Sequence, residues 1–436
     1  MSVRHRKVLL PILLVAVLIV ATSVFITAQQ PSTSEDASFR KALEVITLIK
    51  LHYVEPVSIL DLTREYVAGG SIQALMQAVN DPYSRYLTAK NYSEMQVDTS
   101  GEFGGIGIYM GMREDRITVI APIEGTPAAR AGIKAGDFIS TIDGKSTEGM
   151  SSEQAQNLMR GPKGTKVIIG VERGRDLEYL EFEIIREIIQ VPSVEGKMLE
   201  DGIGYLHVAS FTGTTIQGLH DKLADLQQQG MQGLILDLRF NPGGLLTAAI
   251  DMVDEFVTAG PILHVAGRNG AGRHTISATK EAGFPDLPLV VLVNKGSASA
   301  SEIVAGALKD LGRATLIGTQ TFGKGSVQTI FPLHDGSGLV LTTQKWYSSG
   351  GQSIHLQGIE PNIVLYNPGD EKMEAQLKQM QAEQNGISSG EEQAEQEPSE
   401  AEETASAEHD EPFEDLQLHK AIEVLRAQID SGRKAA

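Results

Sequence analysis

The chain of 436 residues contains no cysteine. It therefore has no disulfide framework, no thiolate nucleophile and no cysteine-ligated zinc or iron–sulfur site. It also lacks the basic stripe that is typical of nucleic-acid-binding proteins, and its formal net charge is −19. We therefore expect no nucleic-acid partner, and nothing in the sequence calls for a metal or another cofactor.

The negative charge is concentrated near the C-terminal end. Residues 383–415 contain 13 Asp and Glu but no Lys or Arg, so the rest of the chain is only mildly acidic. Few apolar residues and many Glu, Gln, Ser and Ala are typical of segments that do not fold alone. We predict an acidic low-complexity linker over residues 371–415 and an amphipathic C-terminal helix within residues 416–436.

The N-terminal end carries an export pattern. Basic residues at positions 4, 6 and 7 precede an apolar run from Val8 to Ile26, which is just long enough to span a bilayer. We interpret residues 1–28 as a signal sequence or membrane anchor and residues 29–37 as a linker. The remainder is then extracytoplasmic, in the cell envelope or periplasm, and either membrane-anchored or secreted. The alternative is a buried core helix.

Three further units follow from the periodicity of apolar residues. Residues 38–98 contain two helical patterns, too short for an independent core. Residues 99–187 alternate short strands, turns and two short helices. Residues 188–370 alternate strands with helices of 10–15 residues, which predicts a multidomain α/β protein with an α/β core.

The segment from Val293 to Glu302 is the first with a chemical pattern. A buried strand ends, small residues make a turn, and a helix begins. This elbow would present a serine hydroxyl beside backbone N–H groups, as a serine nucleophile requires. Alternatively, the small residues only let the helix pack closely on the sheet.

A serine nucleophile needs a base, and no histidine of the chain lies in a triad-like motif. Lys324 is the candidate, because Gly323 and Gly325 flank it and burial can keep a lysine neutral. Gln328 lies four residues further on and is placed to hold the amine. The G-x-x-x-x-G-K pattern that ends at Lys324 does not predict a nucleotide site, since glycine follows where Ser or Thr is needed.

A third segment, Asn241-Pro242-Gly243-Gly244, joins a strand to a helix. The amides of Gly243 and Gly244 are candidates for stabilising an oxyanion. The alternative is a helix-capping turn.

These segments together resemble the carboxyl-terminal processing peptidases, or tail-specific proteases, over residues 38–366. The block Gly-Ser-Ala-Ser-Ala-Ser-Glu begins at Gly296, and the block Gly-Lys-Gly-Ser-Val-Gln begins at Gly323, so that Lys324 follows Ser299 by 25 residues. The two blocks together are the most specific part of the resemblance. The resemblance implies Ser299 as nucleophile, Lys324 as general base and Gln328 as its orienting partner. It also implies oxyanion donors from the Ala300 amide and a Pro-Gly-Gly amide, on a serine protease core of the ClpP/crotonase-like type.

Residues 99–187 resemble the PDZ domain of that family, from Gly101 through Gly136-Asp137 to Asp143-Gly144. Amides near the start of the unit would bind a terminal carboxylate, and the strand from Ile108 would offer an open edge to a peptide. The predicted peptide-binding residues are Gly104, Gly105, Ile106, Gly107, Ile108, Ala155 and Met159. An ordinary glycine-rich turn is the alternative.

The resemblance implies an exported, ATP-independent serine endopeptidase that recognises proteins by apolar C-terminal tails. Two alternatives stay open: a membrane-tethered peptide-binding adaptor, and a latent protease that awaits an activator or adaptor protein. In the latent form Arg160, at the end of the PDZ helix, would relay tail binding, unless it only interacts with the helix dipole. The amphipathic helices also predict a homodimer.

Overall fold

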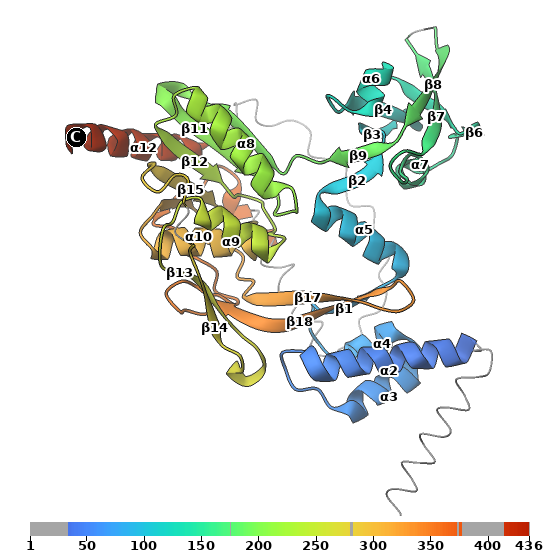
Figure 1. Cartoon of the computed structure of the whole chain (residues 1–436), viewed down its shortest axis with the longest axis horizontal. Helices are drawn as coiled ribbons and strands as arrows, with labels where there is room; N and C mark the ends of the chain where they lie inside the picture. Colours follow the sequence, from blue (N-terminus) through green and yellow to red (C-terminus); the bar gives the residue numbers. More distant parts are fainter. Residues whose placement is uncertain (1–33, 175, 280–281, 373–374, 377–413, 436) are drawn as a thin grey trace, which may run out of the picture.

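The computed structural model describes residues 34–174, 176–279, 282–372, 375–376 and 414–435 (Figure 1). The predicted leader and most of the predicted acidic linker lie outside these residues. Within the described ranges, no helix combines the length and the apolar character needed to cross a bilayer.

The N-terminal unit consists of α2 (Ser34–His52), α3 (Ile59–Gly69) and α4 (Ile72–Gln77). The second predicted helix is divided in two, because Gly70 adopts a left-handed φ of 61° and Ser71 Oγ accepts the Ala74 N–H at 3.1 Å. The three helices share their buried core with side chains from two distant strands, Leu333, Leu339 and Leu341. The unit is therefore not an independent core, as its length predicts.

A short strand, β1 (Arg85–Leu87), and a helix, α5 (Ala89–Ser100), lead to the next unit. No residue of α5 is buried, so the apolar periodicity that identifies most helices is absent here. The Thr88 side chain caps its first turn and Gly101, with φ 72°, ends it. Figure 1 shows α5 between the PDZ-like unit and the long strands of the core.

The next unit is a small β-sheet domain. Its sheet has the order β3-β4-β5-β7-β8, with β6 paired to β5, and β3 is an edge strand. The strands are β3 (Ile108–Arg113), β4 (Arg116–Pro122), β5 (Phe138–Ile142), β6 (Lys145–Ser146), β7 (Lys166–Arg173) and β8 (Glu178–Ile185). Two helices, α6 (Pro127–Ala131) and α7 (Ser152–Met159), cover it, and β2 (Glu102–Gly105) pairs with β9 (Glu187–Gln190) at its base.

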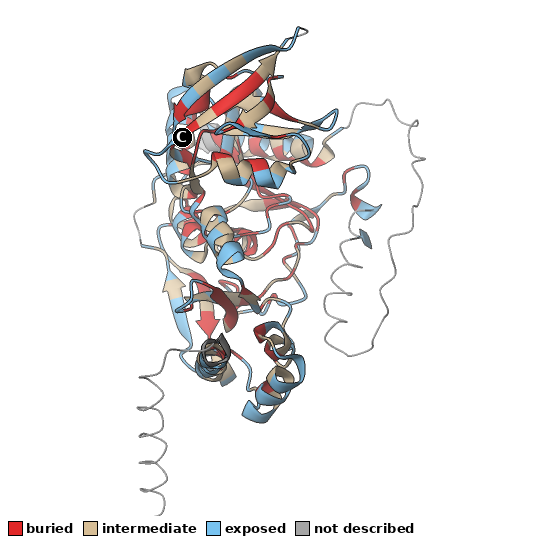
Figure 2. Ribbon diagram, turned by 90° about the vertical axis from the view of Figure 1, so that its right-hand side faces the viewer, coloured by how far each residue is buried: buried red, intermediate tan, exposed pale blue. Residues whose placement is uncertain are grey.

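The core is built on a six-stranded sheet, parallel except for its first strand. In spatial order the strands are β10 (Val194–Met198), β11 (Ile203–Val208), β12 (Gly233–Asp237), β15 (Leu289–Val293), β16 (Thr315–Gly318) and β19 (Ile363–Val364). Alternate residues of the central strands point to opposite faces. One face packs on α8 (Thr215–Gln228), α9 (Leu246–Asp254) and α10 (Ala300–Asp310). Every residue of β12 and β15 is buried. Figure 2 shows buried residues inside the units of the molecule and exposed residues on their outer helices and loops.

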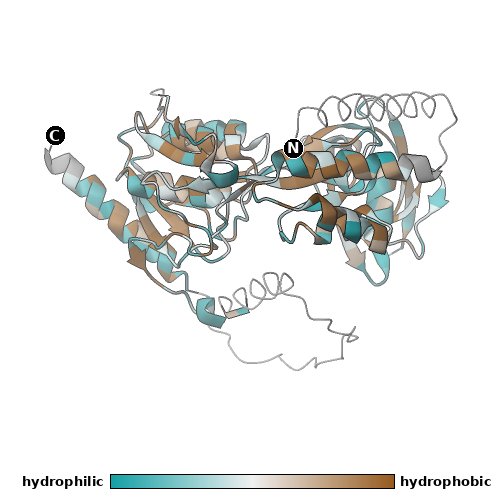
Figure 3. Ribbon diagram, turned by 90° about the horizontal axis from the view of Figure 1, so that it is seen from below, coloured by the Kyte–Doolittle hydropathy of each residue, from teal (hydrophilic) through white to brown (hydrophobic). Residues whose placement is uncertain are grey.

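The other face of that sheet is covered by α12 (Leu416–Ala435), in which apolar and polar residues intermingle (Figure 3). Ala421 and Leu425 are fully buried against side chains that include Ile203 and Val290. The apolar face of the C-terminal helix is therefore covered within the chain rather than by a second subunit.

A second, antiparallel sheet lies beside the first, with the order β1-β18-β13-β14 and β17 paired to β18. Its further strands are β13 (Pro261–Ala266), β14 (His274–Ser277), β17 (Ser326–Pro332) and β18 (Gly338–Tyr347). The multidomain α/β fold that the sequence predicts is confirmed.

One arginine ties the end of α7 to the sheet of the PDZ-like unit. Arg186 is 7% exposed and donates to the carbonyls of Met159 (2.9 Å), Leu158 (2.8 Å) and Lys166 (2.9 Å). Buried carbonyls without a donor are costly. The position of the last turn of α7 therefore depends on this side chain.

We expect Arg186→Met to lower the free energy of unfolding of the PDZ-like unit by about 2–4 kcal/mol, because it leaves these carbonyls unpaired. Amide hydrogen exchange over residues 102–190 measures the effect. The fluorescence of Trp346, which lies in the core, should keep its denaturation midpoint. The exposed Arg113→Met is the matched control, and equal exchange in the two variants would contradict the prediction.

Candidate active site and peptide-binding cavity

Ser299 lies at the elbow between β15 and α10. Its backbone has φ 53° and ψ −111°, a positive φ that costs a non-glycine residue about 1–3 kcal/mol. The two neighbouring serines are structural: Ser297 Oγ donates to the Leu238 carbonyl at 2.7 Å, and Ser301 Oγ to the Asn241 carbonyl at 2.9 Å. Ser299 lines the cavity described below, whereas Ser297 and Ser301 are not part of its lining.

A fully buried carboxylate, Glu302, holds the elbow in place. One of its oxygens accepts the N–H groups of Ser299 and Lys324, both at 2.8 Å. The other accepts the Gly323 N–H at 2.7 Å and the Thr321 hydroxyl at 2.6 Å. Burial raises the pKa of Glu302, and these four donors oppose that rise. The carboxylate thus joins the backbone of the predicted nucleophile to that of the predicted base.

Lys324 lies in a tight turn before β17. A Cβ at Gly325 would approach His355 Cβ to 2.8 Å, so the close approach requires glycine. The amine lies 4.9 Å from the centre of the Tyr83 ring. Burial lowers the pKa of Lys324, the positive charge of Arg85 lowers it further, and the charges of Asp81 and Glu302 oppose the shift. The environment therefore shifts the amine toward its neutral form.

Gln328 is placed differently from the prediction. Its amide nitrogen donates to Ser326 Oγ at 2.9 Å and to Thr342 Oγ1 at 3.2 Å. Within the described residues no hydrogen bond joins it to the Lys324 amine. Gln328 nevertheless lines the same cavity as Lys324.

The Pro-Gly-Gly turn lies against the serine elbow. A Cβ at Gly243 would lie 2.9 Å from both the Ala300 nitrogen and Ser299 Cβ, so only glycine leaves room beside that amide. The Gly243 N–H donates to Asn241 Oδ1 at 2.9 Å, so this candidate amide is already paired in the structure. The amides of Gly244 and Ala300 donate to no acceptor in the described part of the chain.

A cavity of about 550 Å³ gathers these groups. Its lining includes all six predicted residues, namely Ser299, Lys324, Gln328, Ala300, Gly243 and Gly244. The sequence interpretation gave no role to Glu302, Tyr83 or Arg85. For Glu302 the sequence did contain a signal, since this residue ends the serine block. No group of acidic and histidine side chains within the described ranges could hold a metal ion.

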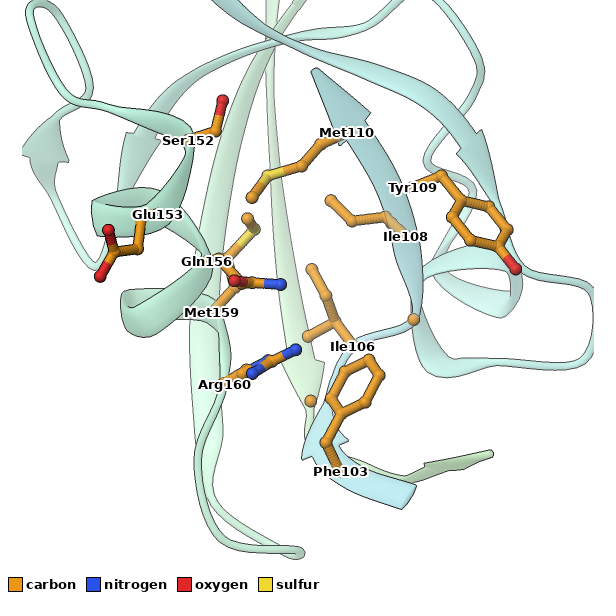
Figure 4. Close-up of a pocket in the computed structure, with 12 residues that line it drawn as sticks. Phe103, Ile106, Ile108, Tyr109, Met110, Ser152, Glu153, Gln156, Met159 and Arg160 are labelled. Carbon is orange, nitrogen blue, oxygen red and sulfur yellow. The ribbon is translucent and has the colours of Figure 1, made fainter. Parts of the chain in front are cut away.

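A second cavity, of about 350 Å³, lies between β3 and α7 (Figure 4). Ile106, Ile108 and Met110 point toward α7, whereas Tyr109 points away. The amides of Ile106 and Gly107 donate to no acceptor among the described residues. The cavity thus combines an apolar wall, free amides and the open edge of β3.

The predicted peptide-binding residues divide into two groups. Gly105, Ile106, Gly107, Ile108 and Met159 line the cavity. Gly104 does not, because its carbonyl accepts the Gly161 N–H at 3.0 Å and its backbone faces the turn after α7. Ala155 is fully buried in the hydrophobic core beneath the cavity. Phe103, Met110 and Gln156 line the cavity and were not predicted.

Arg160 lines this cavity as well. Its guanidinium lies 4.6 Å from the centre of the Phe103 ring. Its Nε is buried without a hydrogen-bond partner among the described residues. This donor is therefore unsatisfied in the described part of the structure.

Two family models match this chain, and each matched range includes part of the lining of one cavity. Residues 202–365 match the model of peptidase family S41, and residues 118–173 match a PDZ domain. The carboxy-terminal-processing protease of Bartonella bacilliformis is 38% identical over 433 residues, which cover 97% of this chain and 96% of that protein. The carboxy-terminal processing protease CtpA of Bacillus subtilis is 36% identical over 377 residues, 85% of this chain and 79% of that protein.

Among solved structures, the photosystem II D1 C-terminal processing protease is 29% identical, with a TM-score of 0.48 over 77% of this chain and 94% of that chain. The sequence relatives make the chain a serine-type peptidase that carries a PDZ domain. Within that class it belongs to the carboxy-terminal processing proteases of family S41. The resemblance inferred from the sequence is confirmed.

We expect Glu302→Gln to lower the free energy of unfolding by about 2–5 kcal/mol and peptidase activity by more than 10-fold. The glutamine would place an NH₂ group, which is itself a donor, against N–H or O–H donors that the wild-type carboxylate oxygen accepts. Trp346 fluorescence during denaturation measures the first effect, and a peptidase assay the second. Glu360→Gln makes the same chemical change at an exposed position and serves as control. Wild-type stability and activity in Glu302→Gln would contradict the role of the carboxylate.

Proposed function

We propose that the protein is an exported, ATP-independent serine endopeptidase that docks the C-terminal tail of a protein substrate in its PDZ domain and cleaves the chain upstream with Ser299 and Lys324. The observation that carries the proposal is the shared cavity of Ser299 and Lys324, in which burial lowers the pKa of the amine. A neutral amine beside a serine hydroxyl is the arrangement that a serine–lysine dyad requires.

In the first step the neutral Lys324 amine accepts the Ser299 proton as Oγ attacks the scissile carbonyl carbon. The amides of Ala300 and Gly244 stabilise the oxyanion that forms. The tetrahedral intermediate collapses, the ammonium protonates the departing amine, and an acyl-enzyme remains. Lys324 then accepts a proton from water, whose oxygen attacks the acyl carbon, and Ser299 Oγ leaves with that proton.

The docking site supports selection of C-terminal tails. The free amides of Ile106 and Gly107 suit a terminal carboxylate, and the apolar wall of Ile106, Ile108 and Met159 suits an apolar last residue. An extended peptide would pair with the open edge of β3.

A series of cavities with shared walls supports a route from the tail site to Ser299. Phe103 and Arg160 line both the PDZ cavity and a neighbouring cavity beside α5. Ser93 and Val97 of α5 line that cavity and a further one. The last of these shares Met95 with the active-site cavity.

A latent protease is the second candidate, and the position of Gln328 favours it. Its amide is bonded to Ser326 and Thr342 and not to the lysine amine. An activator, or the tail itself acting through Arg160, would then have to complete the site. Anchoring by residues 1–28, a location in the cell envelope or periplasm, and a homodimer belong to the same proposal.

The test follows cleavage by the full-length protein, without nucleotide, of an unfolded protein that ends in a free apolar residue. A C-terminally amidated substrate and the Ser299→Ala enzyme are the controls. We expect cleavage of the free acid, at least 10-fold slower cleavage of the amide, and none by the variant. Tail binding without cleavage would favour the latent protease, and equal cleavage of both substrates would refute tail selection.

The charge of Arg85 gives a prediction for the pH dependence. Because this charge lowers the pKa of Lys324, Arg85→Gln should raise that pKa. Less lysine is then neutral at a given pH, so the acidic limb of the kcat/KM profile moves to higher pH. Arg85→Lys keeps the charge and should keep the limb in place. An unmoved limb in Arg85→Gln would count against Lys324 as the base.

A further inference from the structure

The start of α12 is bonded to the segment that leads into the Pro-Gly-Gly turn. Arg239 is 8% exposed, and its guanidinium donates to both oxygens of Asp415 at 2.9 and 2.8 Å. The same guanidinium donates to Asp237 at 2.7 Å. The Arg239–Asp415 contact joins residues 176 positions apart in the chain. Bidentate pairs of this kind fix geometry as well as charge.

Gln417 completes the attachment. Its side chain is fully buried, and its oxygen accepts a second bond from Arg239 at 3.0 Å. Its amide nitrogen donates to the Leu365 carbonyl and to Asp370, both at 2.8 Å. Gln417 therefore connects the first turn of α12 to Leu365 and Asp370 and also fixes the position of the Arg239 guanidinium.

From Arg239 the connection to the active site is short. Phe240 follows with φ 60°, a left-handed conformation that a bulky residue keeps only when its neighbours are fixed. Asn241 comes next and is fully buried. Its side chain accepts the Gly243 N–H at 2.9 Å, and its carbonyl accepts the Ala298 N–H at 3.0 Å. One residue thus contacts both the glycine turn and the serine elbow.

We propose that Asp415 and Gln417 are positioning residues for peptide cleavage: the docked α12 holds Arg239, and Arg239 holds the glycine turn that supplies the Gly244 amide to the oxyanion. The proposal rests on the function proposed above and adds to it a C-terminal element that does not touch the substrate. The apolar contacts of Ala421 and Leu425 with the sheet fix the position of α12. The ion pair of Asp415 with Arg239 then couples the position of the helix to that of the glycine turn.

Asp415→Asn in the full-length protein tests this inference. The amide keeps the shape but loses the charge and one acceptor, so Arg239 has room to shift. We expect kcat to fall at least 10-fold, because small misplacements of catalytic groups have large effects. The KM for the tail substrate and the acidic limb of the pH profile should stay unchanged, since the PDZ cavity and the neighbours of Lys324 are intact. Asp430→Asn, at an exposed site on the same helix, should match the wild type.

Amide hydrogen exchange gives a readout that does not need activity. We expect faster exchange in residues 239–246 and 297–302 of Asp415→Asn, and wild-type exchange in the PDZ unit. Leu425→Ala, which loosens the apolar contact without touching the ion pair, should reproduce both effects. Wild-type kcat and exchange in Asp415→Asn would overturn the proposal, as would equal effects in Asp430→Asn. Absence of Ser299-dependent cleavage by the wild type would refute the proposed function, while the exchange data would still decide the positioning role.

Discussion

The candidate active site depends on one buried carboxylate. Glu302 accepts the backbone N–H groups of Ser299 and Lys324 on a single oxygen, so the two residues are placed relative to each other by main chain. These two backbone hydrogen bonds connect residues that lie 25 positions apart in the sequence. Four hydrogen-bond donors oppose the free-energy cost of burying this carboxylate. They belong to the two segments that carry Ser299 and Lys324, so the same bonds hold these segments in place. The hydrogen bonds of Glu302 therefore both stabilise the fold and position the two candidate catalytic residues.

The environment of the lysine is assembled from two ends of the chain. Asp81 accepts a hydrogen bond from Thr342 Oγ1 at 2.6 Å, and Tyr83 lies beside the amine. Leu339 and Leu341 of β18 lie in the hydrophobic core of the N-terminal helices. The N-terminal unit therefore adjoins the candidate site, because its helices pack on β18 and Thr342 of the same strand is bonded to Asp81.

The sequence predicted what local patterns encode. The strand that ends at Val293 and the helix that follows Ser299 lie where the sequence predicts them, because a continuous apolar run and a turn of small residues mark them. Helix α5 was missed because it buries no side chain. The ion pair of Arg239 and Asp415 could not be inferred, since spacing carries no information about partners 176 residues apart. Ala155 was misplaced because apolar periodicity identifies the buried face of α7 but not which of its residues border a cavity.

The position of α12 in the chain has a consequence for biosynthesis. This helix is translated after every other described element, yet it covers a sheet face that contains Ile203, Ile235 and Val290. Until residues 416–429 have emerged, that face stays exposed to solvent or to chaperones, and the Arg239 guanidinium lacks one of its two carboxylate partners. A nascent chain therefore cannot hold the finished arrangement of its glycine turn. Assembly of this turn is therefore a late event of synthesis, after residues 415–429 have been made and have packed on the sheet.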